Sequence, residues 1–390
     1  MKILYGVVGE GMGHATRSRV VLEHLLARAH TVRVVVSGRA HGFLQRAFAD
    51  RPGITIQEID GLTLAYKGNR LTLRRSVLEN LEHAPKSLLD NVEAYRRMAE
   101  DGFRPEVVVS DFESWAYLYG LRHRIPVVSI DNMQVLNRCR HEGLGREALG
   151  AFRLARAAVK VKLPFAYHYL VTSFFFPPVV KPRTSLVPPI LRPEILAARR
   201  VPGSHVLVYQ TAAANDALVP LLESLPHEFR VYGMNRDERR GNVTLKPFSQ
   251  EGFIDDLRTA RGVIAGGGFS LMGEAVHLGV PMLSVPVEGQ FEQELNARWL
   301  ARLGYGQFAR ALDPDVVTAF LARVDEHEQS LATYPRQGND MLYAAVDEVI
   351  TRAAAGEPAP EVLASPSMAR YDPTAPKRVR ARKRKPTAVS

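Results

Sequence analysis

Cysteine is almost absent from this chain of 390 residues, because Cys139 is its only one. A single cysteine rules out an internal disulfide, so the sequence suits a reducing compartment and we expect a cytoplasmic protein. Long apolar runs are also missing, since no stretch approaches the roughly 20 apolar residues that cross a bilayer. The apolar run at residues 1–8 is broken by glycines before it reaches the length of a signal peptide.

Acidic residues are scarce at one end of the chain. Residues 370–390 contain eight Lys or Arg and one acid, Asp372, and so carry +7 of the total formal charge of +10. The basic character therefore indicates an appended segment rather than a nucleic-acid-binding fold. We expect residues 356–390, rich first in Pro, Ala and Ser and then in Lys and Arg, to be a disordered tail.

The sequence is compatible with more than one partner for the basic tail. Contact with an anionic membrane, which would place the protein at the inner face of that membrane, is one hypothesis. A solubilising extension without a partner is another. Nucleic acid is less favoured, because no aromatic residues are interleaved with the basic ones to stack on bases.

Short β-rich apolar runs alternate with helical patterns over the rest of the chain, which is typical of parallel α/β proteins. The predicted strands of a first sheet are Lys2–Val8, Thr31–Val36, Glu106–Ser110, Pro126–Ile130 and Tyr169–Phe175. Those of a second sheet are Ser204–Gln210, Phe229–Gly233, Val243–Leu245, Gly262–Ala265 and Pro281–Val285. A proline-rich stretch places the hinge near residues 178–200.

We therefore predict an α/β fold of two Rossmann-like, doubly wound parallel-sheet domains that face a central cleft. The first domain spans residues 1–185 and the second spans 186–340. A last helix, predicted at 341–355, is a candidate to cross back to the first domain.

The first predicted strand runs into a glycine-rich loop, Gly9-Glu10-Gly11-Met12-Gly13-His14. Glycines there permit a tight turn and a close approach of the backbone to a ligand. The third glycine of a dinucleotide fingerprint is replaced by His14, and the second strand ends without an acid to hold a ribose. Both departures argue against nicotinamide or flavin, so no cofactor is expected.

His14 has two interpretations. A histidine at the head of a helix and facing the cleft suits general-base chemistry, because its ordinary pKa of about 6.5 lies near physiological pH. It could instead cap the helix or pack beneath the loop. A base needs an acidic partner to hold its tautomer, and Asp111, Asp131 and Glu113 all follow predicted strands at the cleft.

A second glycine-rich turn lies in the C-terminal half. Gly266, Gly267 and Gly268 follow a buried strand and precede a helix, which presents backbone N–H groups to an anion such as a diphosphate. Glu274, about a turn and a half into that helix, could accept both hydroxyls of a ribose. The carboxamide of Gln293 suits sugar hydroxyls.

Residues 246–250 (KPFSQ), the glycine turn with Glu274, Gly279-Val-Pro and Glu292-Gln293-Glu-Leu-Asn296 together resemble the donor signature of GT-B nucleotide-sugar glycosyltransferases. That family includes the lipid-linked N-acetylglucosaminyltransferase of peptidoglycan synthesis and small-molecule UDP-glycosyltransferases, and the resemblance is nearest to poorly characterised bacterial and archaeal members. It spans roughly residues 1–350.

The resemblance implies a role for each matching residue. Phe248 would lie under the base, and Glu274 on the ribose. Gly266–Gly268, with Phe269 and Ser270 beginning the helix, would hold the diphosphate. Glu292 and Gln293 would hold the transferred sugar. His14, oriented by Asp111 and with Gly11 and Gly13 in its loop, would be the base on the acceptor side.

The resemblance implies an enzyme that moves a sugar, most simply from a UDP-sugar, to a hydroxyl acceptor, and that acts in cell-envelope glycan or glycolipid synthesis. Inversion and independence of metal are expected, and a lipid-linked acceptor is one option. Two departures are Gly266, where many small-molecule members carry histidine, and Glu292, where an aspartate is usual.

Other readings of the sequence remain open. Asp313-Pro314-Asp315 has the D-x-D form of metal-dependent transferases, but Asp at a cap and Pro in the first turn are ordinary helix-start signals. The histidines show no zinc-type spacing, so no metal is expected. The alternative functions are a nucleotide-sugar epimerase on the same fold and a non-enzymatic nucleotide-sugar sensor that binds nucleic acid through its tail.

Overall fold

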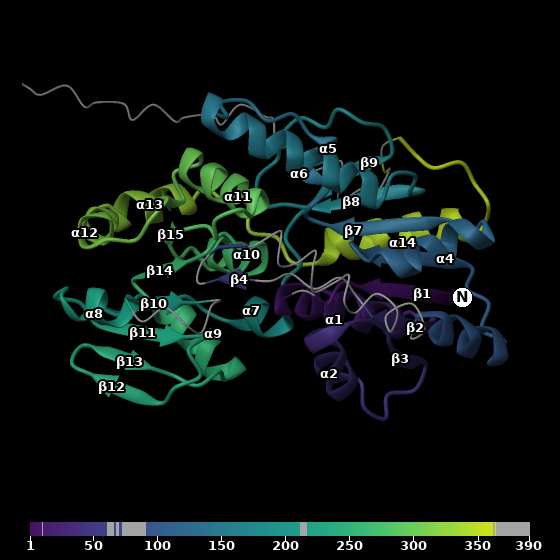
Figure 1. Cartoon of the computed structure of the whole chain (residues 1–390), viewed down its shortest axis with the longest axis horizontal. Helices are drawn as coiled ribbons and strands as arrows, with labels where there is room; N and C mark the ends of the chain where they lie inside the picture. The colour runs from purple at the N-terminus through teal and green to yellow at the C-terminus, as the bar shows by residue number, and fades with distance from the viewer. Residues whose placement is uncertain are drawn as a thin grey trace, which may run out of the picture.

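Two seven-stranded sheets, each covered by helices, make up the protein (Figure 1). The computed structural model describes residues 1–9, 11–60, 66–67, 70–71, 91–210, 217–361 and 363. A short hairpin, β4 (Tyr66–Lys67) and β5 (Arg70–Leu71), lies outside both sheets.

The first sheet is parallel throughout, in the order β3-β2-β1-β6-β7-β8-β9. Its strands are β1 (Lys2–Val7), β2 (Thr31–Val36), β3 (Ile54–Glu58), β6 (Val107–Asp111), β7 (Val127–Asp131), β8 (His168–Thr172) and β9 (Thr184–Val187). The helices are α1 (Met12–Ala27), α2 (Gly38–Ala47), α4 (Ser114–His123), α5 (Val135–Arg138) and α6 (Leu149–Lys162), with a 3₁₀ turn at Arg146–Ala148. Strand order reverses between β1 and β6, and ligands bind at such a switch point in α/β folds.

The second sheet has the order β12-β13-β11-β10-β14-β15-β16, and only β12 is antiparallel. Its strands are β10 (Val206–Tyr209), β11 (Phe229–Tyr232), β12 (Glu238–Arg240), β13 (Val243–Leu245), β14 (Gly262–Ala265), β15 (Met282–Ser284) and β16 (Gly306–Phe308). The helices are α7 (Pro193–Ala197), α8 (Leu218–Glu223), α9 (Gln250–Thr259), α10 (Phe269–Leu278), α11 (Phe291–Arg302), α12 (Pro314–Ala322) and α13 (Val324–Leu331). The switch point here lies between β10 and β14.

The ten predicted strands are all present, most with ends shifted by one or two residues. The edge strands β3, β9, β12 and β16 were not predicted, because β9, β12 and β16 have only three or four residues and β3, with the sequence ITIQE, mixes apolar and polar residues. β9 ends at Val187, so the predicted boundary after residue 185 cuts this strand, and the connection to the second sheet is residues 188–205.

The chain returns to the first domain at its end. α14 (Asp340–Ala354) packs its apolar face, including Leu342, Val346 and Val349, into the core of the first sheet. The tail was predicted to begin at residue 356, which is too early. The Tyr167 hydroxyl donates to the carbonyls of Glu357 and Pro358, and Leu363 is buried in the same core. The basic residues 377–385 lie outside the described residues.

The two domains share an apolar interface next to the cleft. One core cluster contains residues of both, and the Phe175 and Trp299 rings stack across it with centroids 4.9 Å apart. Phe174 packs on Phe269 at the head of α10, with centroids 6.1 Å apart. This contact sets the loop after β1 opposite the loop after β14.

Candidate active site

The loop after β1 brings His14 to the cleft. Gly11, just before α1, has a φ of 85°, a left-handed conformation that glycine adopts without strain. His14 is the third residue of α1, and its side chain is 19% exposed. The imidazole is therefore mostly buried, with a small part of its side chain exposed.

The protein side of His14 faces Asp111, the last residue of β6. His14 Nδ1 lies 2.9 Å from Asp111 Oδ1, and Asp111 is 1% exposed. β1 and β6 are neighbours in register, with Val7 opposite Asp111, so the parallel pairing itself brings the end of β6 beside the loop of β1. This is the histidine–carboxylate geometry of a general base and its partner.

Arg17, one turn after His14 on α1, joins the pair and was not anticipated from the sequence. Its Nε donates to Asp111 Oδ2 over 2.8 Å and its Nη2 donates to Oδ1, and the Ser18 hydroxyl adds a bond of 2.9 Å to Oδ2. Arg17 Nη1 reaches Asn132 Oδ1 at 2.5 Å. The guanidinium is buried, and each of its three nitrogens donates to an acceptor.

These neighbours set the protonation of the pair. Burial, followed by the positive charge of Arg17, lowers the pKa of His14 below its ordinary value. Burial alone would raise the pKa of Asp111, but Arg17 and His14 outweigh it and hold that pKa well below the usual range. At neutral pH the structure therefore holds a neutral imidazole against an ionised carboxylate, which is the starting state a general base needs.

The other two candidate partners of His14 serve different purposes. Asp131 ends β7 and accepts from the Ser129 hydroxyl at 2.6 Å and from the backbone N–H of Gln134 at 2.8 Å. Burial raises its pKa to about 6. Glu113 caps α4 by accepting from two backbone N–H groups, each at 2.7 Å. The geometry pairs His14 with Asp111.

The glycine turn of the second domain lies where it was predicted, between β14 and α10. Gln293 braces it: its Oε1 accepts from the backbone N–H groups of Gly267 and Val287, each at 3.1 Å. A Cβ on Gly267 would lie 2.3 Å from the Gln293 carbonyl oxygen, whereas nothing lies within 4 Å of one on Gly268. The turn therefore packs against α11 at Gly267 and is open at Gly268.

Glu292 connects the two faces of the cleft. Its Oε1 accepts from Asn132 Nδ2 in the first domain at 2.6 Å, and from Asn296 Nδ2 at 2.5 Å. Asn296 Nδ2 also reaches the Gly267 carbonyl at 3.0 Å. Burial raises the pKa of Glu292 to about 7. The predicted sugar-binding carboxylate thus lies between the first domain and the glycine turn.

Glu274 lies in α10 as predicted, but it already has a partner. Both of its oxygens accept from Arg192, with Nε–Oε1 and Nη2–Oε2 distances of 2.7 Å, and both residues are buried. Burial raises the pKa of Glu274, and Arg192 opposes that shift. Since a carboxylate has about four acceptor positions, a ribose contact would use those that Arg192 leaves.

The remaining predicted donor residues surround this turn. Phe248 is 62% exposed, which leaves its ring available to a planar base, and it packs against Phe253. Phe269 begins α10, and the Ser270 hydroxyl donates to the Gly13 carbonyl across the cleft at 3.2 Å. The first and second glycine loops are therefore in direct contact, and Glu10 between Gly9 and Gly11 lies outside the described residues.

Three residues of this site were missed: Arg17, Asn132 and Arg192. A signal existed for the first two, because Arg17 follows His14 at helical spacing and Asn132 ends a strand beside Asp131. Arg192 carried no signal, because its place beside Glu274 depends on the path of the interdomain connection.

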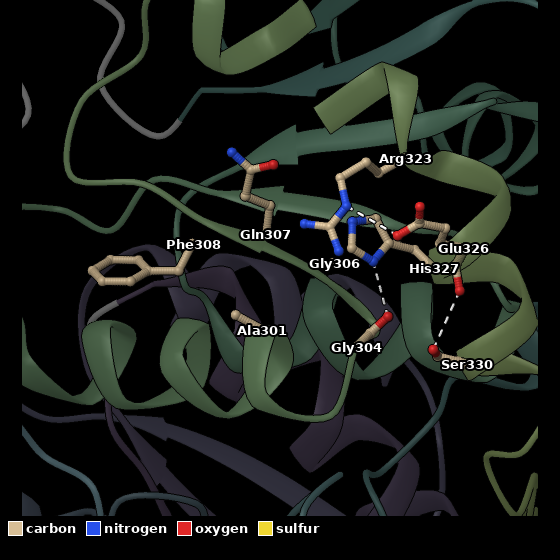
Figure 2. A pocket seen from close by; sticks show the side chains of 9 residues that line it. All are labelled: Ala301, Gly304, Gly306, Gln307, Phe308, Arg323, Glu326, His327 and Ser330. Atoms are coloured by element: carbon tan, nitrogen blue, oxygen red, sulfur yellow. Dashed lines mark hydrogen bonds and ion pairs between the residues drawn. The ribbon is translucent and has the colours of Figure 1, made fainter. Parts of the chain in front are cut away.

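Other features lie apart from the cleft. A cavity of about 300 Å³ is lined by residues at the end of α11, in β16 and in α13, and includes none of the predicted site residues (Figure 2). There, His327 Nδ1 contacts the Gly304 carbonyl at 2.9 Å. Asp313 caps α12 by accepting from the Val316 N–H at 2.8 Å, so the D-x-D sequence is a helix start.

The described part of the chain contains no group of three His, Cys, Asp or Glu residues arranged to hold a metal ion. Within the same residues, no helix is both long and apolar enough to span a membrane.

Comparison with proteins of known sequence relates the chain to glycosyltransferases. Two uncharacterized glycosyltransferases of Methanosarcina acetivorans and Methanosarcina mazei are 25% and 26% identical to it over 357 and 363 residues. Each match covers 84% of this chain and 91% of the relative.

Solved structures share its architecture. The glycotransferase of kitacinnamycin has a TM-score of 0.63 at 16% identity, covering 89% of this chain and 98% of that one. Phytolacca americana UGT2, complexed with UDP-2fluoro-glucose and pterostilbene, has a TM-score of 0.63 at 15% identity, and the match covers 90% of this chain and 98% of that one. Acinetobacter baumannii MurG has a TM-score of 0.56 at 18% identity, and the match covers 90% of this chain and 99% of that one.

The predicted GT-B fold is thus confirmed by these neighbours and by the two facing sheets. A sequence-family model described as glycosyl transferase family 1 matches residues 1–325. The chain therefore belongs to glycosyl transferase family 1 and is a glycosyltransferase.

Proposed function

We propose that this glycosyltransferase moves a sugar from a nucleoside-diphosphate sugar to a hydroxyl acceptor, with inversion and without a metal ion. The observation that carries the proposal is the position of the His14–Asp111 pair. It lies in the first domain where that domain meets the glycine turn of the second, and the two are linked by the Gly13–Ser270 and Asn132–Glu292 contacts.

In the proposed step, His14 Nε2 accepts the proton of the acceptor hydroxyl as that oxygen forms a bond to the anomeric carbon. The bond from this carbon to the diphosphate oxygen breaks, and its electron pair leaves with the diphosphate. Attack on the face opposite the leaving group inverts the anomeric carbon. Asp111 stabilises the imidazolium that results.

The departing diphosphate gains negative charge during this step. The proposal assigns its stabilisation to the backbone N–H groups at the start of α10, from Gly268 to Ser270, and to the positive end of the helix dipole. The first N–H groups of a helix have no partner within it, so they are available to the phosphate oxygens.

Uracil is the base we propose for the donor. Two structural neighbours were solved with UDP or a UDP-sugar, Phytolacca americana UGT2 and LpCGTa. Phe248 would stack on the base, Glu274 would accept from the ribose, and Glu292 would hold the transferred sugar. The reaction needs no further cofactor, and the acceptor is proposed only as a hydroxyl compound.

The test begins with ligand binding. A panel of nucleotides and nucleotide sugars is screened for thermal stabilisation, since a ligand that binds only the folded state raises Tm. The stabilising nucleotide sugar is then incubated with candidate hydroxyl acceptors, and release of nucleoside diphosphate is measured. Sugar rearrangement without an acceptor would indicate an epimerase instead, and failure of every nucleotide to bind would overturn the proposal.

A further inference from the structure

The helix α6 presents apolar side chains to solvent. Leu154 and Val161 lie seven residues apart, about two helical turns, so they share one side of the helix. Their exposed fractions are 65% and 78%, and Ala157 between them is exposed as well. The opposite side of α6 packs into the core, where Val159 is 2% exposed. A surface helix normally carries charged and polar residues on its outer side, so an apolar outer side is unusual.

The exposed apolar residues continue past the end of α6. Phe165 follows the helix by three residues and is 72% exposed. Single exposed apolar side chains are ordinary on protein surfaces. A group of three large ones in one short segment, Leu154, Val161 and Phe165, indicates an interaction surface instead. We call these three side chains, with the three cations that flank them, the α6 surface.

The three cations are Arg153, Arg156 and Lys160, which lie at helical spacing along one edge of the exposed side and are themselves exposed. α6 contains no Asp or Glu, and within the described residues none of these cations pairs with a carboxylate. Burial, followed by three cations including Arg156 and Lys160, lowers the pKa of Lys181, so a further cation lies beside the helix. Cations next to an exposed apolar side are typical of a helix that lies in the interface of an anionic membrane.

The charges distinguish between two partners for such a surface. A second copy of this chain, related by a two-fold axis, would bring the same three cations close to one another. Like charges at short distance repel, and no acidic residue of α6 offsets them. An anionic lipid surface takes up apolar side chains and attracts cations, so it matches both parts of the α6 surface.

The described chain ends beside the same region. The Tyr167 hydroxyl donates to the Pro358 carbonyl at 3.2 Å, and Leu363 is buried in the core that Tyr167 contacts. Residues 364–390 therefore begin near Phe165, and they contain eight Lys or Arg and one acid. Stable peripheral binding to a membrane generally takes two signals, and here a basic segment starts next to an apolar and basic helix.

We propose that the α6 surface docks this protein on an anionic lipid membrane, with its three apolar side chains inserted between the lipids and its three cations beside the phosphate headgroups. The basic segment after residue 363 adds to the attraction from the same domain. The α6 surface contains none of the residues of the cleft, so its role does not depend on the proposed reaction.

Vesicle binding of the full-length protein tests the proposal. Cosedimentation is measured with vesicles of phosphatidylcholine alone and with vesicles that also contain phosphatidylglycerol. We expect binding to the anionic vesicles, weakened by added salt because salt screens the attraction, and much weaker binding to the neutral ones. Absence of binding to the anionic vesicles, or equal binding to both kinds, would overturn the proposal.

The apolar part is tested by Leu154→Ser/Val161→Ser/Phe165→Ser. This variant should bind anionic vesicles at least about 10-fold more weakly, because three apolar side chains no longer leave water on docking. The matched control Leu196→Ser/Val201→Ser removes side chains that are 38% and 54% exposed elsewhere, and it should bind as the native protein does. All five positions are exposed, so Tm should not change. Native-like binding by the triple variant contradicts the proposal.

The cations and the tail are tested separately. Arg153→Gln/Arg156→Gln/Lys160→Gln should weaken binding to anionic vesicles by about 10-fold or more. Deletion of residues 364–390 should weaken binding without abolishing it. If the deletion abolishes binding while both triple variants bind like the native protein, the tail alone is the anchor and the proposal fails. It also fails if the apolar substitutions change only the oligomeric state, measured by sedimentation velocity, because a second copy then covers the surface.

A fluorescent label locates the contact. Cys139 is the only cysteine of the chain and is buried, so Val161→Cys supplies one accessible thiol for an environment-sensitive dye. The emission of the dye should shift to the blue when anionic vesicles are added. The same dye on Val201→Cys should show no shift, and equal responses at the two positions would count against docking through α6.

Discussion

Buried charged side chains form the first-domain face of the cleft, whereas backbone groups and carboxamides form most of the second-domain face. On the first face, Arg17 and Asp111 form an ion pair beside His14, and burial followed by the charge of Arg17 lowers the pKa of His14, against the opposing effect of Asp111. On the second, the glycine turn is braced by Gln293 and Asn296 through bonds to backbone atoms.

The difference follows from what each face has to do. A base must hold one protonation state near neutral pH, and nearby fixed charges achieve this. A diphosphate site must offer many N–H donors close to the ligand without a side chain in the way, and a glycine turn at a helix N-terminus does so. Substitutions on the first face should therefore lower turnover, whereas those on the second face should lower stability or donor affinity.

The largest expected effect is on the first face. His14→Ala should lower turnover by about 10²–10⁴-fold, the usual contribution of a general base, while donor affinity stays close to that of the native protein. Turnover, donor affinity and Tm are measured on the same preparation. A stable His14→Ala protein with near-normal turnover would end the general-base hypothesis and leave the donor site untouched.

Glu274 is, with Glu292, one of two acidic exceptions on the second face, and it is paired with Arg192. Glu274→Ala should lower the free energy of unfolding by about 3–5 kcal/mol, because it leaves the buried Arg192 without its partner. Urea denaturation measures this loss. A stability equal to that of the native protein would show that the Arg192–Glu274 pair does not stabilise the packing of the interdomain connection on α10.

The double variant Arg192→Met/Glu274→Met isolates the ribose role. Replacing a buried pair by apolar side chains of similar size is often nearly neutral for stability, so the double variant should fold. Its affinity for the stabilising nucleotide should still be weakened, because the ribose acceptor is gone. Native affinity in this variant would contradict the ribose assignment.

The glycine turn offers a matched pair of substitutions. Gly267→Ala should cost about 1–3 kcal/mol of stability, as overpacked sites do, because its Cβ meets the backbone of Gln293. Gly268→Ala should be nearly neutral, because its φ of −61° suits alanine and its Cβ meets nothing. Chemical denaturation compares the two, and equal losses would contradict the packing described here.

The smallest expected effect is a pH dependence at Glu292. Its pKa is raised from 4.5 to about 7, so the folded state binds the proton more tightly than the unfolded one and stability falls as pH rises through that window. Glu292→Gln cannot titrate, so it should gain relative to the native protein between about pH 4.5 and pH 7. Because Glu292 is partly exposed, we expect a change on the order of 1 kcal/mol. A difference in unfolding free energy that is constant with pH would argue against the raised pKa.

The sequence alone predicted the strands and turns that have a strong local pattern of residues. Central strands such as β1 and β14 are apolar after at most one residue, and a glycine-rich turn follows each of them. The edge strand β3 was missed because a strand that is only partly buried needs no apolar run, and β9 was missed because its first two residues, Thr184 and Ser185, are polar although they are buried. The tail was predicted to begin too early, because Leu363 is a single apolar residue and no local sequence pattern predicts its burial in the first domain.

The sequence by itself determined the fold class and the candidate residues whose chemistry is unusual in their position, namely His14 with three possible carboxylate partners, the glycine turn and Glu292. Only the tertiary structure decided their partners. Asp111 was separated from Asp131 and Glu113 by strand pairing, since the register of β1 with β6 brings Asp111 beside the loop that holds His14. Buried charges and amides take whichever partner packing brings within hydrogen-bond distance. For Arg17 that packing lies within the first domain, for Asn132 it also includes Glu292 of the second domain, and for Arg192 it depends on the path of the interdomain connection.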